Sequence, residues 1–335
     1  MNSKAEEIDT RHDWAGRSVL ITGGLGFIGS NLARRLVASG AKVTLVDSLV
    51  PEYGGNLFNV EDFKDSIRIN ISDVRDRHSF RHLIEGQDVL FNLAGQTSHQ
   101  DSMLDPFTDL DINCTSQLAI LEACRQHNPC VRVVFASTRQ IYGRPDYLPV
   151  DEKHPLRPTD VNGINKMAGE WYHVLYNNVY GVRACSLRLT NTYGPGMRIK
   201  DARQTFLGIW IRLLLENRPF SVWGGDQLRD FNHVDDVVDA LMLAVSSDAA
   251  AGQIFNLGGS QILTLRALAD MLVEANGGGT YDVQQFPEER KRIDIGDYYA
   301  DFTRFGELGW TPRVPLAKGL AETIEFYRSR LPRYL

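Results

Sequence analysis

The chain has 335 residues, of which 43% are hydrophobic and 23% are charged, and its formal net charge is -6 at pH 7. This composition is typical of a globular protein with one large domain or two domains that share a core. The net negative charge argues against sequence-independent binding of nucleic acid, because such binding needs clustered Lys and Arg to displace phosphate counterions. A small anionic ligand held by a few arginines is compatible with this charge.

The sequence has no sign of export or membrane insertion. The N-terminal segment MNSKAEEIDTRHDWAGRSV is charged and contains no apolar h-region, so it does not resemble a signal peptide. No stretch approaches the roughly 20 apolar residues that span a bilayer. We therefore expect a cytoplasmic protein without a membrane partner. The four cysteines have no CxxC spacing and are interpreted as reduced residues: Cys114, Cys124, Cys130 and Cys185.

The first half of the chain alternates short β-branched runs with amphipathic stretches. Helices are expected at 28–40 and 115–127. Apolar strands separated by helices predict a parallel sheet covered on both faces, which is a Rossmann-type, doubly wound α/β fold. The predicted strands, in chain order, are 18–22, 42–47, 66–70, 89–93, 131–137 and 184–189.

The pattern becomes irregular after Leu189, which predicts a smaller, discontinuous C-terminal domain. A mostly apolar helix is expected at 205–218 and a short strand at 220–224, and a further strand at 253–258 is expected to return to the sheet. The predicted division assigns 16–190, plus about 235–258, to the first domain, and 191–234 with 259–330 to the second.

A glycine-rich loop, VLITGGLGFIGSNLARRL, follows the first predicted strand and opens a helix. Gly23, Gly26 and Gly29 provide a tight turn, close backbone approach to a pyrophosphate, and close helix packing. Asp47 ends the next strand about 20 residues on, where a carboxylate binds the adenosine ribose hydroxyls. An acid there repels a 2′-phosphate, so the sequence predicts NAD rather than NADP.

Two further segments are expected beside the dinucleotide. NISDVRD supplies Asp73, which can reach the adenine, and NLAG ends a strand where the crevice of such a sheet opens. The residues predicted to contact the cofactor are Gly23, Gly26, Phe27, Ile28, Gly29, Asp47, Asp73, Val74, Leu93, Ala94 and Gly95.

Several ordered motifs give the chain a family resemblance. The glycine loop, LAGQTSHQDSMLDPFTDLDIN, VFASTRQIYG, NGINKMAGE, RLTNTYGPG and LRDFNHVDDVVDA follow one another between about Ser18 and Pro312. The chain thereby resembles the extended short-chain dehydrogenase/reductase family, in its nucleotide-sugar epimerase and dehydratase branch. The resemblance implies tightly bound NAD, a nucleotide-diphosphate-sugar substrate whose hydroxyl is oxidised transiently, and a homodimer formed by two helices, 117–127 and 166–179.

The resemblance also implies site residues, position by position. Thr138 matches the residue that hydrogen-bonds the reacting hydroxyl, and Lys166 matches the lysine that holds the nicotinamide ribose. Taken alone, Thr138 can simply end a strand, and an arginine in LRDF commonly pairs with a nearby Asp235 or Asp236. The residues that the resemblance places around the substrate are Gln96, Arg139, Asn191, Arg229, Arg292 and Asp294.

The chain departs from the family pattern in three ways. Asn162 stands where tyrosine usually transfers the proton, and an amide has no pKa near neutrality with which to do so. Arg139 and Gln140 follow Thr138 where dehydratases and decarboxylases carry acids, which disfavours elimination. A cation at Arg139 can instead hold a sugar carboxylate and favour a uronate, while LAGQ and ASTRQIYG resemble CDP-sugar epimerases. These indications leave the sugar open.

The third departure is His99. Histidine as a residue type titrates near neutrality and is a natural replacement for the missing base, although this position is equally well interpreted as a polar loop residue. Lys166 with a lowered pKa is the other candidate, and Asn162 is assigned to orienting a hydroxyl. His78 and His82 have no third ligand nearby, so no metal site is predicted. The sequence predicts a nucleotide-sugar epimerase; a silent binding protein, or a dehydratase or decarboxylase, is the alternative.

Overall fold

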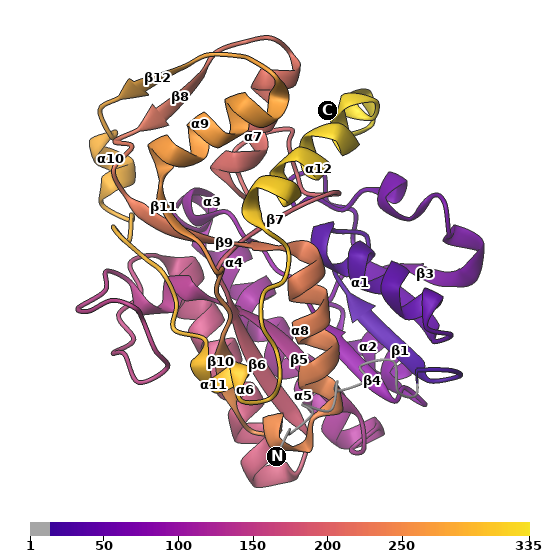
Figure 1. Ribbon diagram of the computed structural model, residues 1–335. Coiled ribbons are helices and arrows are strands. Elements are labelled where there is room, and N and C mark those ends of the chain that lie inside the picture. Colours follow the sequence, from indigo (N-terminus) through magenta and orange to yellow (C-terminus); the bar gives the residue numbers. More distant parts are fainter. Residues whose placement is uncertain (1–13) are drawn as a thin grey trace, which may run out of the picture.

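A seven-stranded parallel sheet forms the centre of the protein (Figure 1). The computed structural model describes residues 14–335, so most of the N-terminal segment that was compared with a signal peptide lies outside the described residues. The strand order is β10-β6-β5-β4-β1-β2-β3. The strands are β1 Ser18–Thr22, β2 Lys42–Asp47, β3 Ile67–Ile71, β4 Val89–Asn92, β5 Arg132–Thr138, β6 Ala184–Leu189 and β10 Ile254–Asn256.

Helices cover both faces of this sheet. On one face α1 (Phe27–Ala38) packs beside α8 (Val234–Ser246), and their apolar side chains share a core with alternate residues of β1. The opposite face carries α2 (Arg77–Ile84), α5 (Ser116–His127) and α6 (Val161–Tyr180). Because β1, β4 and β5 are buried on both sides, they read as nearly continuous apolar runs rather than as alternating ones, whereas β3 at the sheet edge is largely exposed. The predicted doubly wound fold is confirmed.

The predicted strands differ from the observed ones by two residues at most. The segment predicted to return to the sheet does so, because β10 pairs in parallel with β6 at the sheet edge. The division into two domains remains a prediction. The long helix α6 is capped at its N-terminus by Asp160, whose Oδ1 accepts a hydrogen bond from the Gly163 amide, and at its C-terminus by Gly181 in the left-handed conformation.

The C-terminal elements gather at one end of the sheet around a second apolar core (Figure 1). They include a three-stranded sheet of order β11-β9-β7 and a two-stranded sheet, β12-β8. The main elements are β7 Asn191–Tyr193, α7 Phe206–Leu215, β8 Phe220–Trp223, β9 Leu228–His233, β11 Ile262–Thr264, α9 Leu265–Asn276, β12 Tyr281–Gln284 and α12 Leu316–Arg328.

Among residues 14–335, no helix combines the length and the apolar character needed to cross a bilayer. The four cysteines are unpaired, with Cys124 and Cys185 buried and Cys130 exposed.

Short helical segments connect the main elements. They are η1 Leu57–Val60, η2 Lys64–Ser66, α3 His99–Leu104, α4 Pro106–Leu110, the π-helical η3 Asp111–Thr115, η4 Arg139–Tyr142, η5 Asp248–Ala250, α10 Glu288–Lys291, α11 Thr303–Gly306 and η6 Leu331–Arg333.

Candidate active site

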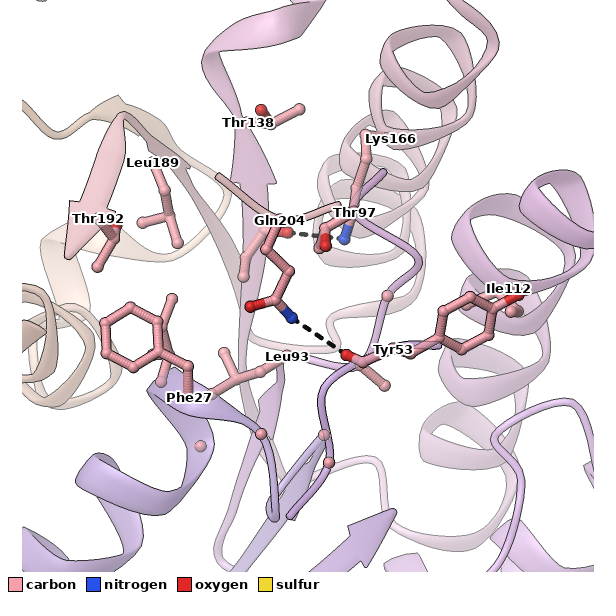
Figure 2. Close-up of a pocket in the computed structure, with 18 of the residues that line it drawn as sticks. Phe27, Tyr53, Leu93, Thr97, Ile112, Thr138, Lys166, Leu189, Thr192 and Gln204 are labelled. Carbon is pink, nitrogen blue, oxygen red and sulfur yellow. Dashed lines mark hydrogen bonds between the residues drawn. The ribbon is translucent and has the colours of Figure 1, made fainter. Parts of the chain in front are cut away.

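A pocket opens at the carboxyl ends of the central strands, where both halves of the chain contribute residues (Figure 2). Figure 2 shows Thr138 and Lys166 on one side of it and Phe27 and Leu93 on the other. Seventeen of the predicted site residues line this pocket: Gly23, Gly26, Phe27, Ile28, Gly29, Asp47, Asp73, Val74, Leu93, Ala94, Gly95, His99, Thr138, Arg139, Asn162, Lys166 and Asn191.

The glycine loop between β1 and α1 is packed too tightly for side chains. Gly23 has a φ of +67°, and a Cβ there would lie 3.0 Å from the Ala94 amide nitrogen. A Cβ on Gly29 would lie 2.3 Å from the Gly23 carbonyl oxygen. The first residues of α1 line the pocket, and the first N–H groups of a helix have no acceptor within it, which suits a pyrophosphate. The loop fits a dinucleotide.

Asp47 is held at the end of β2 by two backbone amides. Its Oδ2 accepts a hydrogen bond from Leu25 at 3.0 Å, and its Oδ1 accepts one from Leu49 at 2.9 Å. Burial raises the pKa of Asp47, and the hydrogen bonds from Leu49 and Leu25 oppose that rise. The carboxylate is thus fixed beside the glycine loop, in position for ribose hydroxyls. Asp73 also lines the pocket, with its carboxylate bonded to Arg75.

Lys166 and Thr138 face the pocket from α6 and from the end of β5. Nζ of Lys166 donates to the Ala136 carbonyl at 3.1 Å and lies 4.8 Å from the centre of the Phe135 ring. Burial lowers the pKa of Lys166 to about 8, and the charge of Asp109 opposes that fall. A Cβ on Gly95 would lie only 2.8 Å from Nζ, so this glycine makes room for the lysine.

Asn162 belongs to a buried network around one carboxylate. It is 2% exposed, and its Nδ2 donates to the Gln96 carbonyl at 2.7 Å and to Asp109 Oδ2 at 3.1 Å. Asp109 also accepts hydrogen bonds from Asn113 at 3.0 Å and Asn165 at 2.8 Å. The nitrogen of Asn162 is therefore engaged by the protein, which leaves its oxygen as the group with which it can orient a hydroxyl.

His99 lies against a carboxylate that the sequence analysis did not single out. Its Nδ1 is 2.9 Å from Oδ2 of Asp160, and the side chain of Asp160 is fully buried. Asp160 was recognisable as a helix N-cap, since it precedes a helical pattern, but its approach to His99 joins segments 61 positions apart in the chain (160 minus 99). The structure thus brings His99 into the same pocket as Thr138 and Lys166.

Arg139 extends from η4 into the same region. One terminal nitrogen, Nη2, donates to Oδ1 of Asn191 at 2.8 Å, and the guanidinium carbon lies 5.4 Å from the centre of the Tyr298 ring. The other terminal nitrogen is buried without an acceptor among residues 14–335. Burial lowers the pKa of Arg139, with Tyr298 and Asp230 opposing that fall. Its positive charge is therefore only partly compensated by the protein.

Four predicted substrate residues lie outside the pocket lining of the described chain. Arg229 is buried, donates to the carbonyls of Leu228 and Gly296, and pairs with Asp294 at 3.3 Å rather than with Asp235 or Asp236. Burial lowers the pKa of Arg229 to about 10, and the nearby charge of Arg139 adds to this. Their assignment to the substrate remains a prediction. The four residues are Gln96, Arg229, Arg292 and Asp294.

Other lining residues were not singled out from the sequence, although some of them, such as Thr97 and Ser137, lie within the motifs quoted above. Gln204 donates from Nε2 to the Tyr53 carbonyl at 3.1 Å, which links the segment before α7 to the loop after β2 across the pocket (Figure 2). The additional polar residues that line the pocket are Ser48, Tyr53, Ser72, Thr97, Ser137, Thr190, Thr192, Gln204 and Thr205.

This fold and pocket define a dinucleotide-binding α/β protein with a second group of elements beside the cofactor end of the sheet. The NAD dependent epimerase/dehydratase family matches residues 19–258. A UDP-glucose 4-epimerase from Mycolicibacterium smegmatis is 34% identical over 314 residues, which cover 93% of this chain and 98% of that protein. The chain therefore belongs to the NAD dependent epimerase/dehydratase family, and NAD is its cofactor.

Relatives that are named for different reactions have similar sequence identity to this chain. A dTDP-glucose 4,6-dehydratase from Streptomyces griseus is 31% identical over 317 residues, covering 92% of this chain and 93% of that protein. The structure of a UDP-glucose 4-epimerase from Thermus thermophilus, in complex with NAD, matches with a TM-score of 0.82 and 30% identity, over 93% of this chain and 99% of that one. Family membership alone does not select between epimerisation and dehydration.

Proposed function

We propose that the protein is an NAD-dependent nucleotide-sugar epimerase. This proposal rests on one observation. Thr138, Lys166 and His99 line the same pocket as the glycine loop and Asp47. These are groups for handling a hydroxyl proton beside a dinucleotide. Bound NAD supplies reversible acceptance of a hydride, so the net reaction is redox-neutral.

The residues of the chain divide between binding and proton handling. Asp47 holds the adenosine ribose hydroxyls, and Lys166 holds the nicotinamide ribose with its ammonium group. Thr138 hydrogen-bonds the reacting sugar hydroxyl, and Asn162 orients a hydroxyl through its amide oxygen. The low pKa of Lys166 also makes it a candidate for accepting the proton.

Epimerisation is favoured over elimination by the side chains that follow Thr138. Arg139 is a cation, and Gln140 donates its amide to Asp160 at 2.8 Å. Neither position supplies the acid that removes or protonates a group on a neighbouring carbon. A dehydratase or decarboxylase is therefore the weaker alternative within this family.

The proposed substrate is a nucleoside diphosphate joined to a sugar that carries a carboxylate. Arg139 stands next to Thr138 in the chain, and both line the pocket, so its charge lies beside the proposed reacting end of the sugar. A partly compensated guanidinium binds an oxyanion strongly, because its planar fork matches the carboxylate geometry. This supports a nucleotide uronate over a neutral hexose.

We also propose a cytoplasmic homodimer formed through α5 and α6. An exposed apolar stripe runs along α6, where Trp171, Leu175 and Val179 are 52%, 48% and 59% exposed. Leu118 of α5, which packs beside α6, is 37% exposed. Apolar side chains at positions four apart form one face of a helix, and a two-fold axis lets that face cover its own copy.

A catalytically silent binding protein is the second candidate, and Asn162 supports it because no titrating group replaces tyrosine at that position. Incubation with UDP-, CDP- and GDP-sugars, followed by NMR of the sugar protons, separates the two. We expect an epimer from at least one uronate. Tight binding of a nucleotide sugar without any epimer, and without absorbance from reduced cofactor, would establish the binding protein instead.

A further inference from the structure

We propose that His99 and Asp160 form a catalytic pair that takes and returns the sugar hydroxyl proton, in place of the missing tyrosine. This inference rests on the proposed epimerase function. Its basis is geometric: Nδ1 of His99 lies 2.9 Å from Oδ2 of Asp160, and the histidine lines the pocket with Thr138 and Lys166. His99 is the catalytic residue of the pair, and Asp160 is a positioning residue.

Asp160 is held in place by two further hydrogen bonds. Its Oδ1 accepts from the Gly163 amide at 2.7 Å as the N-cap of α6, and its Oδ2 accepts from Gln140 Nε2 at 2.8 Å. The side chain is fully buried. A carboxylate held in this way does not swing toward solvent, so it presents the same oxygen to His99 at all times. Buried carboxylates that orient an imidazole act in this manner.

The ring of His99 has one protected edge and one open edge. Nδ1 is sealed from solvent at Asp160, whereas the side chain as a whole is 37% exposed. Nε2 lies on the other side of the ring from the buried Nδ1, and the proposal places this nitrogen toward the pocket. The Nδ1–H direction is not aligned with Oδ2, and such bonds in active sites tighten when substrate is held.

Asp160 determines which nitrogen of the neutral ring carries the proton. A carboxylate beside Nδ1 favours the form with hydrogen on Nδ1, which leaves the lone pair on Nε2 facing the pocket. In the forward step the hydroxyl O–H bond breaks and its proton moves to Nε2, while the carbon loses hydrogen with its electron pair to the cofactor of the proposed function. The imidazolium then stands beside the Asp160 carboxylate. In the return step Nε2 gives the proton back to the sugar oxygen.

The other groups nearby are less suited to this step. Nζ of Lys166 donates to the Ala136 carbonyl, and the nitrogen of Asn162 is bonded to Gln96 and Asp109. The hydroxyl of Thr138 can pass a proton on but is too weak a base to hold it. A neutral imidazole has a lone pair on one ring nitrogen, so it can take a proton and give it back.

The proton position is measured directly by NMR of protein labelled with ¹⁵N-histidine, without any substrate. His99→Gln identifies the His99 signals. We expect wild-type His99 with its proton on Nδ1, and Asp160→Asn with the proton mainly on Nε2. Asn keeps an oxygen acceptor for the helix cap, so the fold is retained. Asp146→Asn, an exposed change beside a different histidine, is the matched control and should leave the His99 signals unchanged.

Turnover provides the second readout, using the nucleotide sugar that the UDP, CDP and GDP panel identifies. Asp160→Asn should lower kcat and kcat/KM together by on the order of 10²- to 10⁴-fold with little change in KM, since it acts on proton transfer rather than on binding. Asp160→Ser, which caps the helix but is too short to reach His99, should show the same loss with an unchanged circular dichroism spectrum.

Different results would refute the His99–Asp160 pair and the proposed epimerase function. A wild-type proton on Nε2, or a proton position unaffected by Asp160→Asn, refutes the pairing whatever the activity. Full turnover in His99→Gln refutes the histidine as base and leaves Lys166. The expected proton position in a protein that converts no nucleotide sugar refutes the proposed function, and with it the proton-transfer role.

Discussion

Nδ2 of Asn162 donates to Oδ2 of Asp109 at 3.1 Å, in an interior where Asp109 is fully buried. The residue at the usual tyrosine position is thus part of the protein's own hydrogen-bond network. The carboxylate of Asp109 accepts hydrogen bonds from the side-chain amides of three asparagines, Asn113, Asn162 and Asn165. Tyrosine at position 162 would need to displace this network, so Asn162→Tyr is not expected to restore a family-type site.

Asn162→Ala should destabilise the protein by about 1 to 3 kcal/mol, because it removes one of the two donors, Asn113 being the other, to the buried Oδ2 of Asp109 and to the Gln96 carbonyl. Urea denaturation measures the loss. Asn178→Ala on the same helix removes an exposed hydrogen bond and should change stability by less than about 0.5 kcal/mol. Turnover should fall only about 10- to 100-fold, the scale of one lost orienting hydrogen bond. Equal stability of the two variants would contradict the network's role.

Asp47→Ala should weaken NAD binding by roughly 1 to 3 kcal/mol, since it removes the acceptor for the adenosine ribose hydroxyls. Calorimetric titration of NAD into stripped protein measures the change, with Asp65→Ala in the exposed η2 as control. Denatured wild-type protein should release NAD on chromatography. Release of mainly NADP, or an unchanged affinity in Asp47→Ala, is incompatible with this site.

Arg139→Gln should reduce the affinity for a nucleotide uronate by about 10-fold or more, because it removes a charge-assisted contact to the carboxylate. UDP-glucuronate, UDP-glucose and UDP are compared by calorimetry in both proteins, with the exposed Arg157→Gln as control. Only the uronate should lose affinity. An equal loss for all three ligands would assign Arg139 to the diphosphate.

Lys166→Met should raise stability at neutral pH while it abolishes most turnover. The folded pKa of Lys166, about 8, lies below its ordinary value of 10.5. Between these values the unfolded chain binds more protons, so the wild-type protein gains stability as pH rises, by up to about 1.4 kcal/mol per pH unit.

The difference in unfolding free energy between Lys166→Met and wild type should therefore shrink from pH 7 to pH 10. Denaturation of NAD-stripped protein across this range measures it, because bound NAD would add its own stabilisation. The exposed Lys153→Met should show no such trend. A constant difference across the range would show that Lys166 is not desolvated in the folded state.

Leu175→Glu should convert the proposed dimer into a monomer, since it places a charge in the centre of the apolar stripe of α6. Light scattering at micromolar concentration reports the mass. Ile262→Glu is the matched control, because Ile262 is 47% exposed and Leu175 is 48% exposed. A wild-type monomer, or a dimer that survives Leu175→Glu, would exclude this interface.

The sequence alone determined the class of fold and the cofactor loop. Strands β1, β4 and β5 were recognisable because strands buried on both faces consist of nearly continuous apolar residues, and β3 was recognisable from its β-branched residues although it is largely exposed. Gly23, Gly29 and Asp47 were recognisable because the turn, the helix packing and the ribose contact each restrict the residue type at a set spacing. These features depend on contacts between neighbouring segments of the chain.

Only the tertiary structure decided which side chains meet in the pocket and which pair elsewhere. Asp160 reaches His99, and Asp109 gathers Asn162, because the folded sheet brings the loop after β4 against the start of α6. Arg229 carried a family motif, yet it pairs with Asp294 away from the pocket lining. A motif restricts local backbone geometry, whereas the partner of a buried charge is set by which distant segments supply the compensating group.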